Sequence, residues 1–321
     1  MITLRQLRYF CAVARLRHFG RAAEECSVSQ PALSVQIQEL EQALGVTLVE
    51  RGRGRAELTA AGVEIEKRAR GILTDTRDLM DFARHRGAFL GGPFRLGVIP
   101  SIAPYLLPGA LPALHARFPD LDLQLRETMT AALLDELVAG RLDLVLLSLP
   151  LEQPALESIR LFDDAFVLAA PAGGAEEAAA PLEPLSRLEM RNLLLLEEGH
   201  CLREQALTYC KVISPDLRSQ FGASSLATLI QMVANGYGST LLPEIAVPSE
   251  LRGDRRIVVK RFPAPEPMRT IGLAWRKSSP RKTDFIALGR VITESSSALL
   301  EEARRVLDAS AVDRLRPKAR S

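Results

Sequence analysis

Apolar side chains in the first sixty residues recur at the three- and four-residue spacing of helices, in three short segments. Ser29 is a favourable N-cap for the third segment, and Pro31 is tolerated in its first turn. One face of this third helix is apolar, and the opposite face is small and polar. The pattern predicts a helix-turn-helix, whose polar face is free to enter a DNA major groove. The expected apolar face comprises Leu33, Ile37, Leu40 and Leu44.

Two further elements are expected beside the helix-turn-helix. Arg51, Arg53 and Arg55 alternate with glycines, as in a β-wing whose side chains reach phosphates or a minor groove. Residues 59–90 then carry a long apolar stripe at helical spacing, with little nearby in the sequence to bury it. Such a helix usually pairs with another, so we expect residues 59–90 to be a linker and dimerisation helix. The α-helical winged helix-turn-helix domain is predicted to cover residues 1–58.

From residue 91 onward, short strand-like and helix-like runs alternate. LDLVLLSL is typical of a buried strand, and AALLDELVAG is typical of a helix. We expect a mostly parallel sheet covered by helices, arranged as a two-lobed α/β regulatory domain over residues 91–300. Ligand sites in such folds lie at the carboxyl ends of strands. The basic residues 301–321 are expected to form a flexible tail.

Composition narrows the class of protein. A hydrophobic content of 47% with 25% charged residues is typical of a globular protein, and no apolar run is long enough for a membrane span. The N-terminus lacks the apolar core of a signal peptide, so we expect a cytoplasmic protein whose thiols stay reduced. The formal charge is +3 over residues 1–90 and −3 over residues 91–300, which is compatible with a DNA-binding head.

The four cysteines fall into two groups. Cys11 and Cys26 lie on apolar helix faces and are expected in the core. Cys201 and Cys210 are nine residues apart in a helical pattern. Nine residues of helix rise about 13.5 Å, whereas a disulfide needs its Cα atoms within roughly 7 Å, so a bond between these thiols requires the helix to unwind.

The residues alone leave the role of Cys201 open. Most free cysteines are buried and inert. However, Cys201 follows Gly199 and His200 at an expected helix N-terminus, with Arg203 close behind. A helix N-terminus and a nearby cation both favour the thiolate, the species that attacks peroxide.

The residues resemble the LysR-type transcriptional regulators. The segment FGRAAEECSVSQPALSVQIQELEQALGVTLVERGRGRAELTAAG is similar to the winged helix-turn-helix of that family. Within the family, EEGHCLREQALTYC and SSLATLIQMVANGYGSTLLPEIAVP are similar to the OxyR group of hydrogen peroxide sensors. The resemblance covers roughly residues 1–298. It implies a periplasmic-binding-protein-like regulatory domain and a homotetramer built as a dimer of dimers.

The resemblance also implies a reaction and its partners. Cys201 would be the peroxidatic cysteine and Cys210 the resolving cysteine, joined in a disulfide that refolds the intervening segment and changes the binding of promoter DNA. Glutaredoxin or thioredoxin systems would reduce the disulfide, and RNA polymerase would be a further partner at antioxidant genes. The protein would be a stoichiometric sensor rather than an enzyme. The side chains expected around the peroxide are Ser101, Thr130, His200, Arg203 and Arg269.

Two departures from the family pattern stand out. Ser101 occupies a strand end where relatives often carry threonine, and KVISPDLRSQ after Cys210 differs from the family.

Contacts to DNA bases and to the DNA backbone are expected from Ser29, Gln30, Pro31, Ser34, Gln38, Arg51, Arg53 and Arg55. The four histidines do not fall into ligand spacing with any cysteine, so we expect no metal, and no cofactor motif is visible.

Three alternatives remain at the level of sequence. A regulator of the same family could bind a metabolite between the lobes, with incidental cysteines. A thiol peroxidase is a second alternative, but it leaves the first ninety residues unexplained. A solute-binding transport protein is disfavoured by the DNA-binding head and by the absence of a signal peptide. Counting the thiols consumed by one equivalent of peroxide separates the first alternative from a peroxide sensor.

Overall fold

The computed structural model describes residues 1–51, 55–84, 90–172, 193–210 and 222–315 of the chain. The chain divides into two compact units, residues 1–87 and residues 88–321. Each unit has a hydrophobic core of its own. No helix within the described residues is long and apolar enough to cross a membrane.

The first unit is a winged helix-turn-helix. The Thr3 side chain caps the first helix through a reciprocal capping box with Gln6, and Ser29 Oγ accepts the backbone N–H of Ala32 to cap the third. Gly45 ends the third helix in the left-handed region, with φ +70°. The elements are α1 (Leu4–Leu16), α2 (Phe19–Glu25), α3 (Gln30–Leu44), the antiparallel pair β1 (Val49–Arg51) and β2 (Ala56–Leu58), and α4 (Ala60–Arg84).

The predicted apolar face of α3 is confirmed for three of its positions. Leu33, Ile37 and Leu40 are completely buried against Phe10 and Val13 of α1, and Leu44 is partly buried at the edge of the same cluster. By contrast, α4 packs Ala69 against this cluster but leaves large apolar side chains in solvent. The exposed apolar side chains of α4 are Val63, Ile72, Leu79, Met80 and Phe82.

The second unit is a two-lobed α/β domain built on a mixed sheet. Its strands are β3 (Gly92–Val98), β4 (Leu121–Glu127), β5 (Leu144–Leu149), β6 (Leu156–Pro171), β7 (Thr240–Pro243), β8 (Ile257–Arg261) and β9 (Met268–Arg276). The order is β4-β3-β5-β9-β6-β7, with β8 also paired to β6. The long strands β6 and β9 pair antiparallel and connect the two lobes.

The expectation of a mostly parallel sheet was wrong. Pairings of β3 with β4 and with β5 are parallel, but β9 runs antiparallel to β5, and β6 runs antiparallel to β7, β8 and β9. The physical reason lies in the connections between the lobes. The chain crosses from the first lobe to the second along β6 and returns along β9, so the two connecting strands must run in opposite directions.

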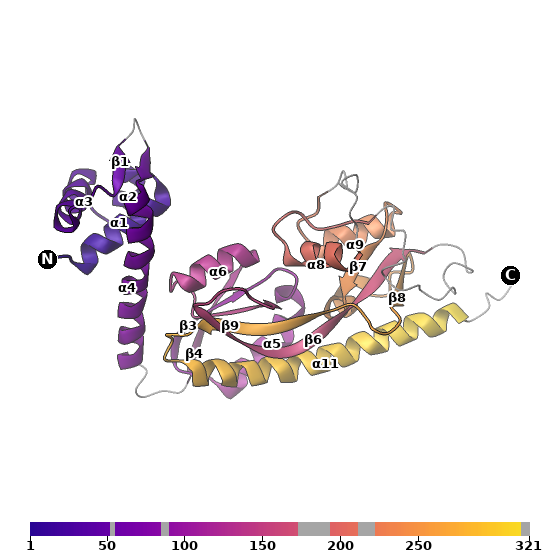
Figure 1. The fold of residues 1–321 in the computed structure, drawn as a ribbon. Coiled ribbons are helices and arrows are strands. Elements are labelled where there is room, and N and C mark those ends of the chain that lie inside the picture. Colours follow the sequence, from indigo (N-terminus) through magenta and orange to yellow (C-terminus); the bar gives the residue numbers. More distant parts are fainter. Residues whose placement is uncertain (52–54, 85–89, 173–192, 211–221, 316–321) are drawn as a thin grey trace. The chain divides into compact units, whose positions relative to one another are not determined.

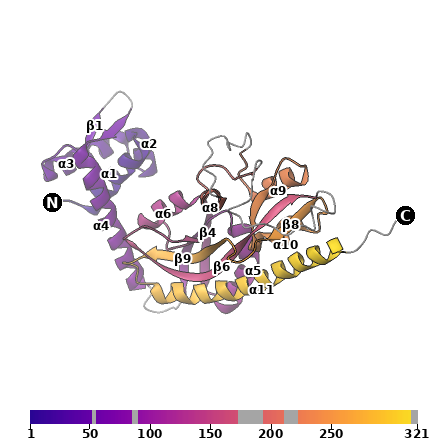
Figure 2. The same ribbon diagram turned by 45° about the vertical axis from the view of Figure 1, so that its right-hand side comes forward.

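Helices cover both faces of this sheet. Figures 1 and 2 show α5 and α11 along one side and α6, α8 and α9 on the other. These helices are α5 (Ala103–Arg117), α6 (Thr130–Val138), α8 (Cys201–Cys210), α9 (Leu226–Ala234), the short η2 (Glu244–Ala246) and α10 (Val247–Leu251), and α11 (Lys282–Leu315).

The C-terminal region differs from the expected flexible tail over residues 301–321. Residues 301–315 continue α11, and only residues 316–321 lie outside the described part. The helix persists because Leu300, Ala303 and Leu307 recur at helical spacing and are buried on the domain.

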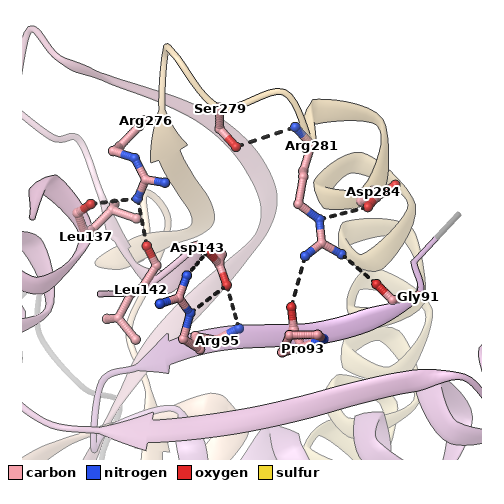
Figure 3. Close-up of polar contacts among 10 residues, drawn as sticks. All are labelled: Gly91, Pro93, Arg95, Leu137, Leu142, Asp143, Arg276, Ser279, Arg281 and Asp284. Atoms are coloured by element: carbon pink, nitrogen blue, oxygen red, sulfur yellow. Dashed lines mark hydrogen bonds and ion pairs between the residues drawn. The ribbon is translucent and has the colours of Figure 1, made fainter. Parts of the chain in front are cut away.

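Three arginines, of which Arg276 and Arg281 are buried, hold segments of the first lobe together (Figure 3). Arg281 donates to the carbonyl of Pro93 at 3.0 Å and pairs with Asp284, while Arg95 pairs with the buried Asp143 at 2.7 Å. Arg276 donates to the carbonyls of Leu137 and Leu142 at 2.8 and 2.7 Å. The bonds from Arg276 satisfy the carbonyls of two buried residues, Leu137 and Leu142.

Candidate functional sites

The thiol at residue 201 lies where an extended segment turns into a helix. Leu193 and Leu196 form bridges to Ser239 and Ala223, and the chain then turns through exposed Glu197, Glu198 and Gly199. Helix α8 begins at Cys201, as the sequence predicts. The Cys201 side chain is partly buried and packs against the core of the regulatory unit. Its sulfur forms no disulfide and, among the described residues, no hydrogen bond.

Helix α8 holds residues 201 and 210 at its two ends. It spans ten residues as an α-helix, so the Cα atoms of its terminal residues are separated by about 13.5 Å of helical rise. That distance is about twice the span that a disulfide allows. The structure is therefore that of a chain in which these two cysteines are not bonded to each other. The side chain of Cys210 lies outside the described part of the structure.

Two of the predicted site residues, His200 and Arg203, lie close to Cys201 along the chain. Arg203 donates to the carbonyl of Leu196 at 2.9 Å, which ties the first turn of α8 back to the segment before it. His200 is buried, and this burial lowers the pKa of its imidazole, against the opposing effect of Glu197. His200 is therefore neutral near pH 7, able to donate one hydrogen bond and accept another.

The start of α6 lies against the start of α8. Gly199 has φ +98°, and a Cβ atom there would come within 2.7 Å of the Met129 sulfur. Only glycine satisfies both demands. Met129 is the N-cap of α6, and the next residue is Thr130. The Thr130 hydroxyl is buried and has no hydrogen-bond partner among the described residues, so it is available to a ligand.

Ser101 and Arg269 come together directly. Arg269 on β9 donates from Nη1 to Ser101 Oγ at 2.8 Å and from Nη2 to the Ser101 carbonyl at 3.0 Å. The same guanidinium pairs with Asp164 on β6, whose other oxygen accepts the backbone N–H of Ile245 at 3.1 Å. Burial raises the pKa of Asp164, while Arg269 acts in the opposite direction. No hydrogen bond among the described residues joins this group to Cys201.

Sequence reasoning missed three polar residues that position α8 and Arg269. Asp164 lies in the strand-like run LFDDAFVLAA, where a buried carboxylate is unexpected and could have been noticed. Gln205 donates to Ser148 Oγ on β5 at 2.5 Å, and the Tyr209 hydroxyl donates to the carbonyl of Met268. The last two contacts join segments more than fifty residues apart, and no local sequence pattern predicts them.

The helix-turn-helix presents part of the predicted DNA-binding set to solvent. Gln30, Pro31 and Gln38 on α3 are exposed, and Ser34 is half-buried between them. Ser29 uses its hydroxyl to cap α3, so its role is in positioning this helix as well as in any contact with DNA. In the wing, Arg55 is exposed, the side chain of Arg51 is not described, and Arg53 lies outside the described residues.

The described residues hold no group of three or more histidine, cysteine, aspartate or glutamate side chains that could bind a metal ion.

Comparison with known proteins identifies a family for each of the two units. Residues 4–63 match the family described as bacterial regulatory helix-turn-helix protein, lysR family, and residues 88–296 match the LysR substrate binding domain. The chain belongs to the LysR family. The DNA-binding transcriptional dual regulator OxyR of Escherichia coli strain K12 is 42% identical over 291 residues, covering 91% of this chain and 95% of that protein.

Solved structures of OxyR are similar over nearly the whole chain. The full-length protein from Pseudomonas aeruginosa, with one cysteine replaced by aspartate, matches with a TM-score of 0.71 and 37% identity, covering 91% of this chain and 98% of that one. A cysteine-to-serine mutant of Corynebacterium glutamicum OxyR with hydrogen peroxide bound matches with a TM-score of 0.63 and 33% identity, covering 94% of this chain and 97% of that one. The predicted LysR-type fold, with its resemblance to OxyR, is confirmed.

Proposed function

We propose that this LysR-family protein is a peroxide-responsive transcriptional regulator whose switch is a disulfide between Cys201 and Cys210. One observation carries the proposal: the two cysteines stand at opposite ends of a single ten-residue helix. A bond between them is impossible while that helix exists. Oxidation would therefore stabilise a different local fold, which is what a two-state regulator requires.

The chemistry proceeds in two balanced steps. The Cys201 thiolate attacks hydrogen peroxide and breaks the O–O bond, giving a sulfenic acid and hydroxide, which takes up a proton to become water. The Cys210 thiolate then attacks the sulfenic sulfur, forms the S–S bond and releases hydroxide. A cellular dithiol of the glutaredoxin or thioredoxin systems returns two electrons and resets the switch.

Polar groups near the start of α8 suit the first step. Thr130 offers a hydroxyl that has no partner among the described residues, and neutral His200 offers an N–H. These groups would orient the peroxide and stabilise the departing hydroxide. Arg203 and the Arg269–Ser101 pair would act by position, since each guanidinium already donates to another group of the protein.

The remaining thiols are poorly suited to react. Burial raises the pKa of Cys11 to about 12, and burial also raises the pKa of Cys26. Since the thiolate is the nucleophile, both cysteines stay protonated at neutral pH and react slowly. Oxidation would therefore be selective for the regulatory unit.

The output would be a change in promoter binding. The exposed polar face of α3 and the wing arginines contact DNA, and α4 pairs with the same helix of a second copy to build a homotetramer as a dimer of dimers. Such a regulator acts in the cytoplasm, contacts RNA polymerase at its promoters and is consumed stoichiometrically by peroxide, without the turnover of an enzyme.

The experiment treats the fully reduced chain with one equivalent of hydrogen peroxide, alkylates the remaining thiols and maps disulfides by mass spectrometry. We expect two thiols to disappear and a linked peptide pair containing Cys201 and Cys210. A Cys26→Ser control should react in the same way. If Cys201 and Cys210 both remain alkylatable, the redox proposal fails, and a metabolite bound between the lobes becomes the better hypothesis.

A further inference from the structure

A basic cavity in the first unit is not accounted for by the redox switch. It has a volume of about 470 Å³, within the range of roughly 300–1,000 Å³ that is usual for ligand sites. Three arginines and a histidine line it together with a single carboxylate, that of Glu57. The complete lining is Leu16, Arg17, His18, Arg21, Arg55, Ala56 and Glu57.

The backbone of Arg17 holds two parts of this cavity together. Its carbonyl accepts the backbone N–H of Ala56 at 3.0 Å, which joins the end of α1 to the beginning of the wing strand β2. Arg17 also adopts φ +51°, in the left-handed region where glycine is the usual residue at the end of a helix. Glycine would adopt this backbone conformation without strain, so the turn itself does not require an arginine.

The polar groups of the cavity are already oriented as donors. Arg21 donates from Nη2 to the Leu16 carbonyl at 2.9 Å, which restrains its guanidinium. The backbone N–H of Arg21 donates to His18 Nδ1 at 3.3 Å, which leaves the Nε2–H of the imidazole as a donor. Arginine guanidinium groups match the oxygen geometry of a phosphate, and the histidine adds a further donor.

The position of the cavity identifies which phosphate it would bind. A Cβ atom on Gly20 would lie 3.1 Å from His18 Cε1 and 3.5 Å from Gln30 Oε1, so His18 lies beside the first residue of α3. On its other side the cavity is lined by Arg55 of the wing. The cavity therefore lies between the helix expected in the major groove and the wing expected in the minor groove, where the DNA backbone separates the two grooves.

We propose that this cavity is a clamp for one phosphate of the DNA backbone, with Arg17, Arg21 and Arg55 as its cations and His18 as a further hydrogen-bond donor. The proposal rests on the DNA-binding role of the first unit and does not depend on the cysteine chemistry. It adds Arg17, His18 and Arg21 to the predicted DNA-binding set. It also gives Arg55 a specific partner, a phosphate shared with the end of α1.

The test measures binding of the reduced, full-length protein to a long DNA duplex of mixed sequence over a series of salt concentrations. Each neutralised phosphate contributes about 0.9 to the slope of log K against log salt. Arg17→Gly and Arg55→Gln should each lower this slope by about 1 and weaken binding about fivefold at 0.15 M salt. The double variant should lose little more than either single variant, because both arginines hold the same phosphate.

Arg17→Gly is a sharp probe because glycine suits the left-handed backbone at this position. Its thermal midpoint should be no lower than that of the wild type, so weaker binding cannot be attributed to misfolding. Lys67→Gln is the matched control: it removes the same charge from an exposed position on α4 and should leave the slope unchanged.

Two results would overturn the clamp while the wild type still binds DNA. One is an unchanged salt slope in Arg17→Gly and Arg55→Gln. The other is binding of inorganic phosphate to the wild-type chain without DNA, lost in Arg17→Gly, while the DNA slope stays the same. That second result would assign the cavity to a small free anion. Failure of the wild type itself to bind the duplex would instead count against the proposed function.

Discussion

Asp164 and Arg269 face each other across the β6–β9 pair and form an ion pair of 2.9 Å in which both side chains are 0% exposed. The two strands are those that connect the lobes. All three nitrogens of the guanidinium bond to Asp164 or Ser101, so these two residues fix the position of Arg269 and join the end of β3 to the connecting strands. Three segments of the regulatory unit thus depend on one buried charge.

Removing the carboxylate of Asp164 should therefore lower the free energy of unfolding substantially. Asp164→Asn leaves the Arg269 guanidinium buried without a counter-ion, and we expect the regulatory unit to lose about 3–5 kcal/mol of unfolding free energy. Urea unfolding measured in the full chain gives this number. Asp163→Asn is the matched control, because Asp163 is partly exposed and pairs with an exposed arginine, Arg160. It should cost about 1 kcal/mol or less. Equal losses in the two variants would show that burial does not set the strength of the pair.

Ser101 should matter through its hydroxyl rather than its size. Ser101→Ala removes the acceptor of Arg269 Nη1 and leaves a buried N–H unsatisfied, which should cost about 1–3 kcal/mol. Ser101→Thr keeps the hydroxyl and should lie close to the wild type. We also expect Ser101→Ala to slow oxidation of Cys201, measured as thiol loss under excess peroxide. If oxidation is equally fast in both variants, Ser101 does not contribute to the peroxide site.

The lowered pKa of His200 predicts that the folded protein loses stability in mild acid. Burial lowers its folded pKa below the ordinary value of 6.5, so between these two pKa values the unfolded chain binds more protons than the folded chain. The contribution of His200 is therefore complete above pH 6.5 and declines as the pH falls toward the folded pKa. Urea unfolding at about pH 7.5 and 5.5 should show a larger loss in the wild type than in His200→Asn.

Glu197 offers a check on this explanation. Its charge raises the His200 pKa, so Glu197→Gln should lower that pKa further and enlarge the loss of stability in acid. A loss that is unchanged in His200→Asn would assign the acid sensitivity to other groups.

The sequence predicts well those elements that depend on interactions between residues close together in the chain. The helix-turn-helix follows from apolar spacing, the Ser29 cap and the glycine at position 45, all within one short segment. The α8 helix and its two cysteines follow in the same way. The pairing of Asp164 with Arg269 does not, because it depends on the register of two strands 105 residues apart in sequence.

Three other features could not be predicted from the sequence, for related reasons. The 34-residue helix α11 carries a polar TESSS segment that hides its apolar spacing, and only packing against the domain reveals which face is buried. The approach of Met129 to Gly199 depends on how two lobes meet. The sequence does not predict the basic cavity, because an arginine at the end of a helix is common. The left-handed backbone conformation of Arg17 is known only from the structure.

The apolar side of α4 should hold copies of the chain together. Leu79 is 67% exposed, and Ile72 lies two turns before it on the same side of the helix. Leu79→Glu places a charge in the expected helix–helix contact, so sedimentation should show smaller assemblies than in the wild type. Lys67→Glu puts the same carboxylate elsewhere on the helix and serves as the control. An unchanged size distribution in Leu79→Glu would exclude this face as an interface.

The contacts that anchor α8 should set the balance between the dithiol and the disulfide. The Tyr209 hydroxyl donates to the Met268 carbonyl, and the Tyr209 ring packs edge-on against Phe166 with centroids 5.8 Å apart. If α8 must unwind for Cys201 to reach Cys210, this hydrogen bond exists only in the dithiol form. Tyr209→Phe removes it, keeps the ring, and should destabilise the dithiol by about 1 kcal/mol.

That loss corresponds to an approximately fivefold larger equilibrium constant for oxidation, or a reduction potential about 20 mV more negative. Equilibration against a dithiol buffer, followed by alkylation, measures it. Ser148→Ala, which removes the acceptor of Gln205 on β5, should shift the balance in the same direction. Thr208→Ala removes only a bond within α8 to the Glu204 carbonyl, so it should change the potential less than either. A potential that is the same in Tyr209→Phe, Ser148→Ala and the wild type would mean that α8 keeps its contacts with the sheet on oxidation, and the disulfide would then have to form without release of the helix.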